Sequence, residues 1–263
     1  MVNALDLTSG VAKQITSNIF NNPNKEIPFS ENLVFNIDMA NSPITETSGK
    51  VTRINSISPI DPNNFVRQNN IDRAPRLSTE TLANAPVLEY QDDDIIERGL
   101  SPSSGTFQNN QAGFIILKAL KPVSGSGGFF NENIFGLATA TNVTLNSTPT
   151  IVSANFQNTF TNAGGSIVSV TNLDEDRWYV LHWGTDPATP NIMYCYIDGV
   201  QVGTITHNID IPANQFGGPR LDKASGAAND YGDKFVQYLF FNRSLSSAEH
   251  TEVYEFLKNK WGL

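Results

Sequence analysis

From Glu31 to Asn242 the sequence is dominated by short runs in which apolar and polar residues alternate, with turn residues between them. Alternation of this kind is typical of half-buried β-strands, because successive side chains point to opposite faces of a strand. Residues 32–39 (NLVFNIDM), 85–94 (APVLEYQDDD) and 112–120 (AGFIILKAL) are examples, and the last is apolar on both faces. Many short strands separated by closely spaced turns indicate a β-sandwich or jelly roll.

The clearest local prediction is a β-hairpin over residues 192–206 (IMYCYIDGVQVGTIT). Asp198-Gly199 at its centre predicts a two-residue type I′ turn, since both positions of that turn need a positive φ. We expect Cys195, inside the first strand, to be a small buried apolar residue and not a nucleophile. The turn predicts the following cross-strand pairs: Ile197 with Val200, Cys195 with Val202, and Met193 with Thr204.

The end of the chain carries its one strong helix signal. Residues 234–242 (KFVQYLFFN) are apolar on both faces and predict a covered strand. Ser246 and Glu249 then have the spacing of a capping box, in which each satisfies a backbone amide of the other. The helix that follows has an apolar stripe with the spacing i, i+3, i+4, i+7: Val253, Phe256, Leu257 and Lys260. We expect this helix to pack across one end or one face of the sandwich, with Trp261 as its anchor.

Composition limits the partners that the chain can have. A length of 263 residues suits one large β domain, and a single cysteine excludes an internal disulfide framework. The net charge of −9 lacks the basic footprint that a nucleic acid partner requires. The first residues show no basic stretch followed by an apolar core, and no apolar run approaches about 18 residues. We therefore expect no secretory signal and neither a nucleic acid nor a membrane as partner.

The first part of the chain differs from the rest, being polar and rich in asparagine and serine. We divide the chain into an extended N-terminal arm, residues 1–31, and a sandwich domain, residues 32–263. The arm either folds back on its own domain or binds a neighbouring subunit as it becomes ordered. Five apolar side chains spaced between polar residues are the candidate anchors: Ile15, Ile19, Phe20, Ile27 and Phe29.

Several quoted segments, in chain order, carry a family resemblance: "LVFNIDMANSPITETSGKVTRI", "NNFVRQNNIDRAPRLSTETLANAPVLEYQDDD", "DRWYVLHWGT", "YCYIDGVQVGT" and "YLFFNRSLSSAEHTEVYEFLKNKWG". Together they resemble the concanavalin A-like lectin/glucanase superfamily, in the laminin-G-like form common in phage and bacterial surface proteins. The resemblance spans about residues 32–263 and is most distinctive in the last segment. It implies an all-β fold: a two-sheet antiparallel jelly-roll sandwich with one C-terminal helix.

Some members of this superfamily are retaining glycosidases, whose carboxylates alternate along one strand so that they face each other about 5 Å apart. The sequence has no such run. Gln91 stands between Glu89 and Asp93, where the central acid would be, and Asp174 and Asp176 lack a following glutamate. No P-loop, dinucleotide-binding or nucleophile-elbow motif occurs either. We therefore expect that the protein is not an enzyme.

Cofactor signals are few. His182, His207 and His250 are scattered along the sequence and have no transition-metal spacing. Residues 61–64 (DPNN) and 91–94 (QDDD) could offer oxygen ligands to calcium, although neither is an EF-hand loop. The sequence predicts no other cofactor.

Glycan binding is suggested by aromatic residues on or near the strands that would line a concave sheet: Trp178, Trp183, Tyr194 and Tyr196. Aromatic rings stack on the apolar faces of sugars, but a sandwich core also needs large rings. We expect the tryptophans to belong to the core. For Tyr194 and Tyr196, the candidate glycan-binding residues, the core and the sugar platform both stay open.

Two functions fit these observations. The first is a virion structural protein of a bacteriophage or cyanophage, a capsid decoration (cement) protein or a tail or fibre subunit. Its arm would anchor it to other virion proteins in many copies, or as a homo-oligomer. The alternative is a free-standing carbohydrate-binding lectin module. The resemblance fits either function, because a fold does not fix what it does.

Overall fold

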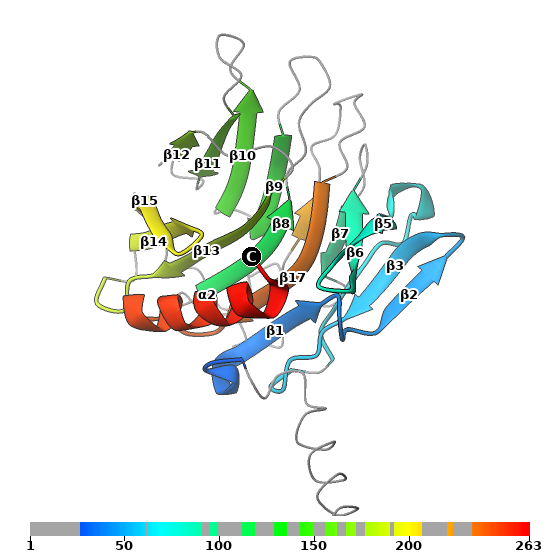
Figure 1. Ribbon diagram of the computed structural model, residues 1–263, viewed down its shortest axis with the longest axis horizontal. Coiled ribbons are helices and arrows are strands. Elements are labelled where there is room, and N and C mark those ends of the chain that lie inside the picture. The colour runs from blue at the N-terminus through cyan, green and yellow to red at the C-terminus, as the bar shows by residue number, and fades with distance from the viewer. Residues whose placement is uncertain are drawn as a thin grey trace, which may run out of the picture.

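The computed structural model describes residues 27–61, 63–90, 95–98, 112–118, 129–135, 143–149, 156–161, 167–171, 177–189, 192–206, 220–222 and 233–263. These residues form antiparallel β-strands and a C-terminal α-helix, which confirms the predicted all-β sandwich (Figure 1). Within these ranges no helix is long and apolar enough to cross a membrane.

The strands form three sheets. The largest has eight strands, in the order β15 (Val200–Thr206), β14 (Ile192–Ile197), β13 (Trp178–Thr185), β8 (Ala112–Lys118), β17 (Asp233–Phe241), β6 (Ala85–Tyr90) and β5 (Arg76–Leu82), with β1 (Leu33–Asp38) also paired to β17. The five-stranded sheet has the order β16 (Arg220–Asp222), β7 (Ile95–Arg98), β4 (Phe65–Arg67), β3 (Lys50–Asn55) and β2 (Ile44–Thr47). The four-stranded sheet has the order β12 (Ile167–Thr171), β11 (Phe156–Thr161), β10 (Val143–Pro149) and β9 (Phe129–Phe135).

The two smaller sheets continue each other, because β9 lies beside β16. At the other end of the four-stranded sheet, β12 lies next to β15 of the eight-stranded sheet. One layer of the sandwich is therefore the eight-stranded sheet. The second layer, which we expected to be a single sheet, is divided into the five-stranded and the four-stranded sheet. Two short 3₁₀ helices, Ser30–Asn32 (η1) and Ile71–Arg73 (η2), complete the described elements.

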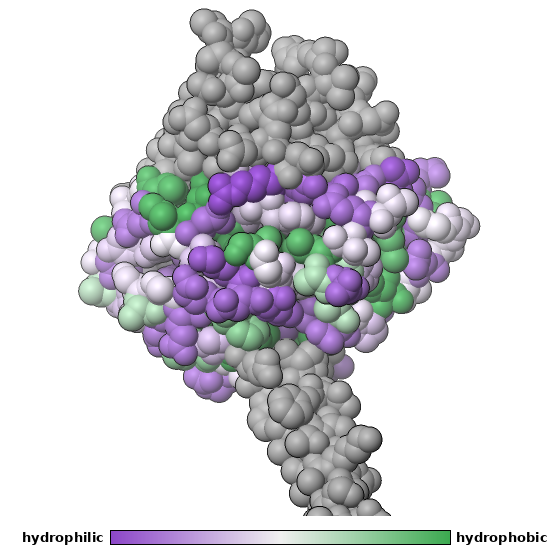
Figure 2. Space-filling view, viewed as in Figure 1, coloured by the Kyte–Doolittle hydropathy of each residue, from purple (hydrophilic) through white to green (hydrophobic). Residues whose placement is uncertain are grey.

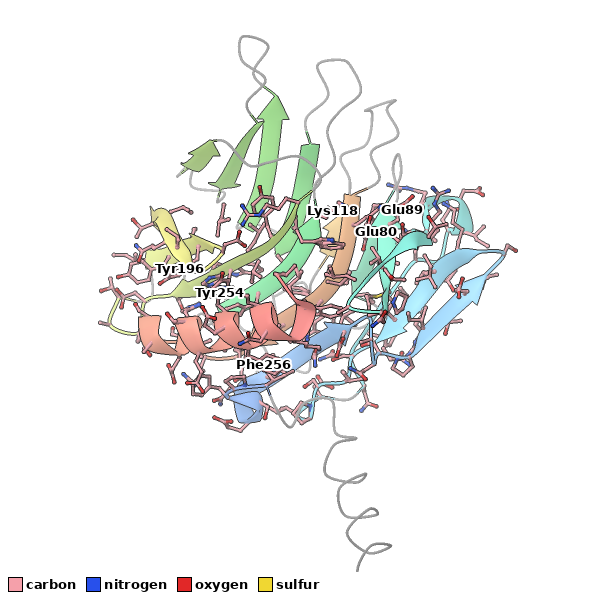
Figure 3. The ribbon with its side chains drawn as sticks, viewed as in Figure 1. Glu80, Glu89, Lys118, Tyr196, Tyr254 and Phe256 are labelled. Atoms are coloured by element: carbon pink, nitrogen blue, oxygen red, sulfur yellow. The ribbon has the colours of Figure 1, made fainter. Side chains whose placement is uncertain are left out.

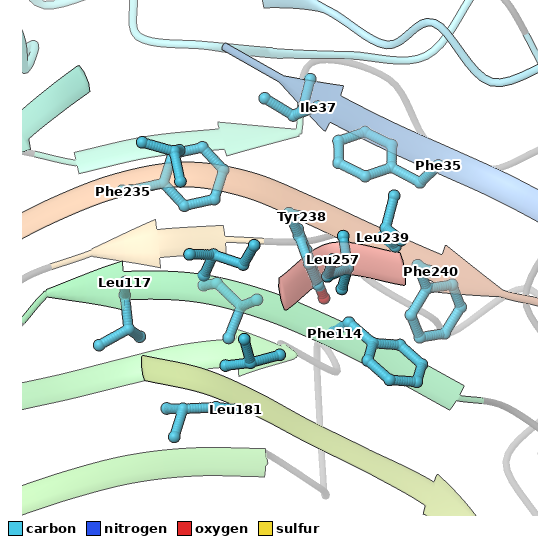
Figure 4. Close-up of a cluster of buried hydrophobic side chains, with 14 of the residues drawn as sticks. Phe35, Ile37, Phe114, Leu117, Leu181, Phe235, Tyr238, Leu239, Phe240 and Leu257 are labelled. Carbon is cyan, nitrogen blue, oxygen red and sulfur yellow. The ribbon is translucent and has the colours of Figure 1, made fainter. Parts of the chain in front are cut away.

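The core occupies both faces of the eight-stranded sheet, because its central strands are buried on both sides. Leu181, Ile115 and Tyr238 are in direct cross-strand register on one face and are at most 1% exposed. Phe114 and Leu239 are paired on the opposite face and are fully buried. Figure 4 shows Phe114, Leu181, Tyr238 and Leu239 in this cluster of buried side chains. Each such side chain contributes about 1.5–3 kcal/mol to folding.

The C-terminal helix α2 (Ser247–Trp261) begins with the predicted capping box between Ser246 and Glu249. It ends at Gly262, which has the positive φ of 70° that favours glycine. The helix lies across β13, β8 and β17 on one face of the eight-stranded sheet (Figure 1). We call this the outer face.

The buried stripe of α2 differs in part from the predicted one. Phe256 and Lys260 are only partly buried, and the stripe instead consists of His250, Val253, Leu257 and Trp261. Trp261 is the anchor that we expected, because it is 2% exposed and its Nε1 donates to Gln237 Oε1 at 2.7 Å. The prediction of the helix was correct, but only Val253 and Leu257 of the four predicted positions belong to its buried stripe.

The β14–β15 hairpin has the predicted turn, with φ of 48° at Asp198 and 77° at Gly199. Its first pair, Ile197 with Val200, is also as predicted. The other two predicted pairs are wrong, because a β-bulge shifts the register beyond Tyr196. The observed pairs are Cys195 with Gly203 and Met193 with Ile205. Cys195 is fully buried, and its burial raises the pKa of the thiol, so it is not a nucleophile.

Of the five candidate anchors of the arm, Ile15, Ile19 and Phe20 lie outside the described residues. Ile27 is 2% exposed and belongs to the hydrophobic core of the sandwich. Phe29 packs against the same core, and the guanidinium of Arg243 lies 5.1 Å from the centre of its ring. The end of the arm is therefore folded back onto its own domain, so Ile27 has no free side chain to offer a partner.

Candidate functional site

A line of large polar side chains crosses five strands of the eight-stranded sheet. Trp178 on β13 is directly opposite Lys118 on β8, and Lys118 is opposite Lys234 on β17. Lys234 is in turn opposite Glu89 on β6, which is opposite Arg76 on β5. Residues that are directly opposite in antiparallel strands share a face of the sheet. We call these five residues the polar row.

The polar row lies on the outer face, beside α2. Ile116 is two residues from Lys118 on β8 and is paired with Gln237 on β17, which accepts a hydrogen bond from Trp261 of the helix. Figure 3 shows Lys118, Glu89 and Glu80 together on the same side of α2. Figure 2 shows hydrophilic residues in a band across this face. The row therefore lies beside the helix, with Lys118, Lys234 and Glu89 largely buried and with Trp178 and Arg76 more exposed.

Glu80 on β5 binds both lysines of the row. Lys118 Nζ donates to both carboxylate oxygens of Glu80, at 3.0 and 3.2 Å. Lys234 Nζ donates to Glu80 Oε2 at 2.5 Å. Like charges directly opposite each other destabilise a sheet. Glu80 compensates for the Lys118–Lys234 repulsion, which explains why both lysines can be largely buried.

Glu89 is held by a second set of partners. Arg76 Nη2 donates to Glu89 Oε1 at 2.6 Å, and Ser78 Oγ donates to Oε2 at 2.7 Å. Lys234 Nζ is 3.9 Å from the same Oε2, so it links the two glutamates. The result is a connected set of charges whose geometry is fixed before any ligand arrives.

Both glutamates are ionised at neutral pH. Burial works to raise the pKa of Glu80, but the hydrogen bonds from Lys234 and Lys118 outweigh it and hold the pKa below the usual value. Burial likewise acts to raise the pKa of Glu89, and the hydrogen bonds from Ser78 and Arg76 reverse that effect. A retaining or inverting glycosidase needs one carboxyl group that stays protonated to act as an acid. Neither glutamate meets that requirement.

Trp178 ends the row and differs from the other tryptophans on this sheet. Its side chain is only partly buried, and Lys118 Nζ lies 6.0 Å from the ring centre. Trp183, by contrast, is fully buried in the core as expected. A partly exposed aromatic ring beside fixed hydrogen-bonding groups is an arrangement that can hold a polar ligand with one apolar face.

The two candidate glycan-binding tyrosines share a face of β14 but lie away from the polar row. Tyr196 is 6% exposed, and its ring stacks on His182 with a centre-to-centre distance of 4.5 Å. It therefore offers no open ring face to a sugar. Tyr194 is partly buried and donates its hydroxyl to Asp186 Oδ2 at 2.7 Å. A glycan role for Tyr194 stays a prediction.

His182 and His250, which are 68 positions apart in the sequence, are in contact. His182 and His250 are each 1% exposed, and their Nδ1 atoms are 3.2 Å apart. His182 is stacked between Phe114 and Tyr196, which covers both faces of its ring. The sequence did not predict this contact, which forms because α2 brings His250 onto β13. His207 lies outside the described residues.

The described residues give little support for calcium binding. Asp61 Oδ2 accepts from Asn64 Nδ2 at 2.8 Å, so it serves the local turn, while residues 91–94 lie outside the described part. Among the residues whose side chains are described, no three of His, Cys, Asp and Glu are grouped to hold a metal ion.

Comparison with known proteins identifies the fold but no family. No family model and no curated protein sequence matches the chain. Among solved structures, the botulinum neurotoxin serotype D binding domain is similar, with a TM-score of 0.58, 12% identity, and coverage of 87% of this chain and 51% of that one. The Trypanosoma rangeli sialidase in complex with sialic acid has a TM-score of 0.60 and 10% identity over 98% of this chain and 40% of that one.

A third similar structure is the botulinum neurotoxin serotype D ligand-binding domain in complex with N-acetylneuraminic acid. It has a TM-score of 0.57 and 12% identity over 89% of this chain and 54% of that one. The chain spans about half the length of the solved structures it matches. At such low identity the likeness shows the fold alone, which is an antiparallel β-sandwich.

Proposed function

We propose that this chain is a non-catalytic carbohydrate-binding module and that the polar row, with Glu80, is its sugar-binding surface. The observation that carries the proposal is the position of Trp178 at the end of a line of fixed charged groups. An aromatic ring packs against the apolar face of a sugar, while carboxylates and ammonium groups bond to its hydroxyls.

Two further observations support a sugar as the ligand. The described charges are already paired with one another, so the surface suits a neutral or zwitterionic polar ligand that needs both donors and acceptors. Similar solved structures include two that are described with a sialic acid bound. A non-catalytic role is supported by the pKa of Glu80 and of Glu89, both of which are held low.

The experiment is a glycan array with the whole chain, followed by titration of any sugar that binds. We expect Trp178→Ala to weaken binding about tenfold or more and Trp178→Phe to retain most of it. Phe256→Leu is the matched control, because it alters a partly buried aromatic residue on α2 that does not belong to the row. The proposal is wrong if no glycan binds, or if Trp178→Ala binds as tightly as the unaltered chain.

We also propose, as a second candidate, that the module stands on a bacteriophage or cyanophage particle, as a capsid decoration protein or a tail or fibre subunit. The favouring observation is that Ile27 and Phe29 fix the base of the arm to the core. Whatever residues 1–26 bind would therefore carry the whole sandwich with it.

The test of this second proposal is a deletion that spares the core. Removal of residues 1–26 leaves Ile27 in place and should give a folded chain that no longer joins its assembly. A deletion of residues 1–31 would also remove Ile27 and destabilise the sandwich by about 2–5 kcal/mol, which would obscure the result. Full incorporation of the chain that lacks residues 1–26 would exclude the anchoring role.

A further inference from the structure

The five-stranded sheet carries its own cross-strand row, and that row is rich in arginine. Thr45 on β2 is opposite Arg53 on β3, and Arg53 is opposite Arg67 on β4. The backbone register continues the row to Glu97 on β7 and Arg220 on β16. Three arginines and one glutamate are thus aligned across a sheet of a chain whose overall charge is −9.

Arg53 and Arg67 point away from the core. Their neighbours Ile54 and Val66 are opposite each other, belong to the core cluster, and are 1% and 2% exposed. Successive residues of a strand point to opposite faces, so the two arginines share the other face. Arg67 is exposed and Arg53 is partly exposed, which leaves both accessible.

Arg53 is held in place by two contacts. Its guanidinium lies 3.5 Å from the centre of the Phe65 ring, and its Nε donates to Asn55 Oδ1 at 2.7 Å. Phe65 is 5% exposed although it is not part of the core cluster, so neighbouring side chains on its own face of the five-stranded sheet cover it. The guanidinium of Arg67 lies 5.9 Å from the same ring centre. Phe65 therefore forms an apolar floor beside both cations.

Among the side chains that the structure describes, none balances the charge of the Arg53–Arg67 pair. Within the part of the chain whose side chains are described, no carboxylate lies within 4.0 Å of either guanidinium. Among the same residues, the guanidinium of Arg67 makes no hydrogen bond, and that of Arg53 makes one through Nε and none through its Nη atoms. Two like charges directly opposite each other cost stability, whereas an anion between them would turn repulsion into attraction. Guanidinium groups bind planar and tetrahedral oxyanions through two parallel hydrogen bonds.

We propose that Arg53 and Arg67 form an oxyanion-binding site that takes a carboxylate or sulfate group of a ligand, with Phe65 as its apolar floor. The site is separate from the polar row, which lies on the eight-stranded sheet, and it does not depend on the proposed sugar site. The Asn55 contact leaves the Nη groups of Arg53 to face the anion.

The test is proton–nitrogen NMR of the arginine Nε–H groups of the whole chain during titration with sulfate or with glucuronate. Both probes carry an oxyanion, and the two titrations distinguish a sulfate from a carboxylate. Chloride at equal ionic strength is the blank. We expect the signals of Arg53 and Arg67 to shift and saturate with at least one oxyanion and not with chloride.

Two substitutions of Arg67 and one control substitution test whether the arginine pair binds the oxyanion. Arg67→Gln should weaken oxyanion binding about tenfold or more, because it removes charged hydrogen bonds worth about 1.5–3 kcal/mol. Arg67→Lys keeps the positive charge but loses the planar guanidinium that donates two parallel hydrogen bonds, so the variant should bind the oxyanion with intermediate affinity. Lys258→Gln, on α2, is the matched control for loss of one positive charge. Binding that is absent in the unaltered chain, or weakened equally by Lys258→Gln, overturns the proposal.

Discussion

Acidification below pH 6.5 should unfold this protein through the His182–His250 contact. The two Nδ1 atoms are 3.2 Å apart, so one donates and the other accepts, and the accepting ring is neutral. A proton on the accepting nitrogen would place two N–H groups against each other. Among the described residues, neither Nε2 has a hydrogen-bond partner that could stabilise a charged ring.

The pKa values give the size and sign of the effect. Burial lowers the pKa of His250 to about 4, with a small opposing effect from Glu249, and burial also lowers the pKa of His182 well below its usual value. The unfolded chain therefore binds protons below pH 6.5 that the folded chain excludes. The free energy of unfolding should fall by about 1.4 kcal/mol per pH unit for one histidine, and about twice that for both.

The assay is urea unfolding followed by tryptophan fluorescence between pH 7.5 and pH 4.5. Above about pH 5.5 the lowered pKa values of Glu80, Glu89 and Glu249 contribute little, because the carboxyl groups of the unfolded chain bind protons only near their ordinary pKa of about 4.3. The histidine effect is therefore measured between pH 7.5 and pH 5.5. His250→Gln should be less stable at pH 7.5 but should show a flatter pH dependence. If the unaltered chain is equally stable at pH 7.5 and pH 5.5, the two histidines are not buried as neutral partners and the reasoning fails.

Three further substitutions test the packing, each by thermal or urea unfolding. Gly113→Ala should destabilise the protein by about 1–3 kcal/mol, because the new Cβ would lie 2.3 Å from the Trp183 ring; little change would mean that the ring can move. Ser246→Ala should cost about 1 kcal/mol through loss of the capping box, and an unchanged stability would show that the cap is unimportant. Gln237→Leu should cost about 1–3 kcal/mol, because it leaves the buried Nε1 of Trp261 unpaired; a stabilised variant would contradict this.

Local chemistry explains what the sequence could predict. Asp198-Gly199 and the Ser246–Glu249 capping box each encode their geometry within a few residues, and both were confirmed. The hairpin register beyond Tyr196 was not predictable, because a bulge depends on how the hairpin docks onto β13 and not on the turn.

The polar row could not be predicted from the sequence. Lys234 and Glu80 are 154 positions apart, and only the order β5–β6–β17–β8 brings them together. Alternation shows which side chains of one strand share a face, but not which strands become neighbours. Lys118 gave a further misleading signal, since it ends a run that is otherwise apolar on both faces.

The same limit applies to the histidine pair. The single local hint was that His250 precedes the buried Val253 by three residues, which places both on one face of a helix. No feature of the sequence indicated that the helix face with His250 and Val253 would contact His182. Ile27 shows the reverse error, because an apolar residue in a polar segment was taken as an anchor for a partner and is part of the core.

The most direct test of the central claim is a crystal structure of the whole chain with a bound oligosaccharide selected from a glycan array. The account predicts an intact sugar packed on the Trp178 ring, with hydroxyl groups bonded to Glu80, Lys234 or Arg76. A sugar bound elsewhere on the molecule, or one found cleaved at these side chains, would contradict it.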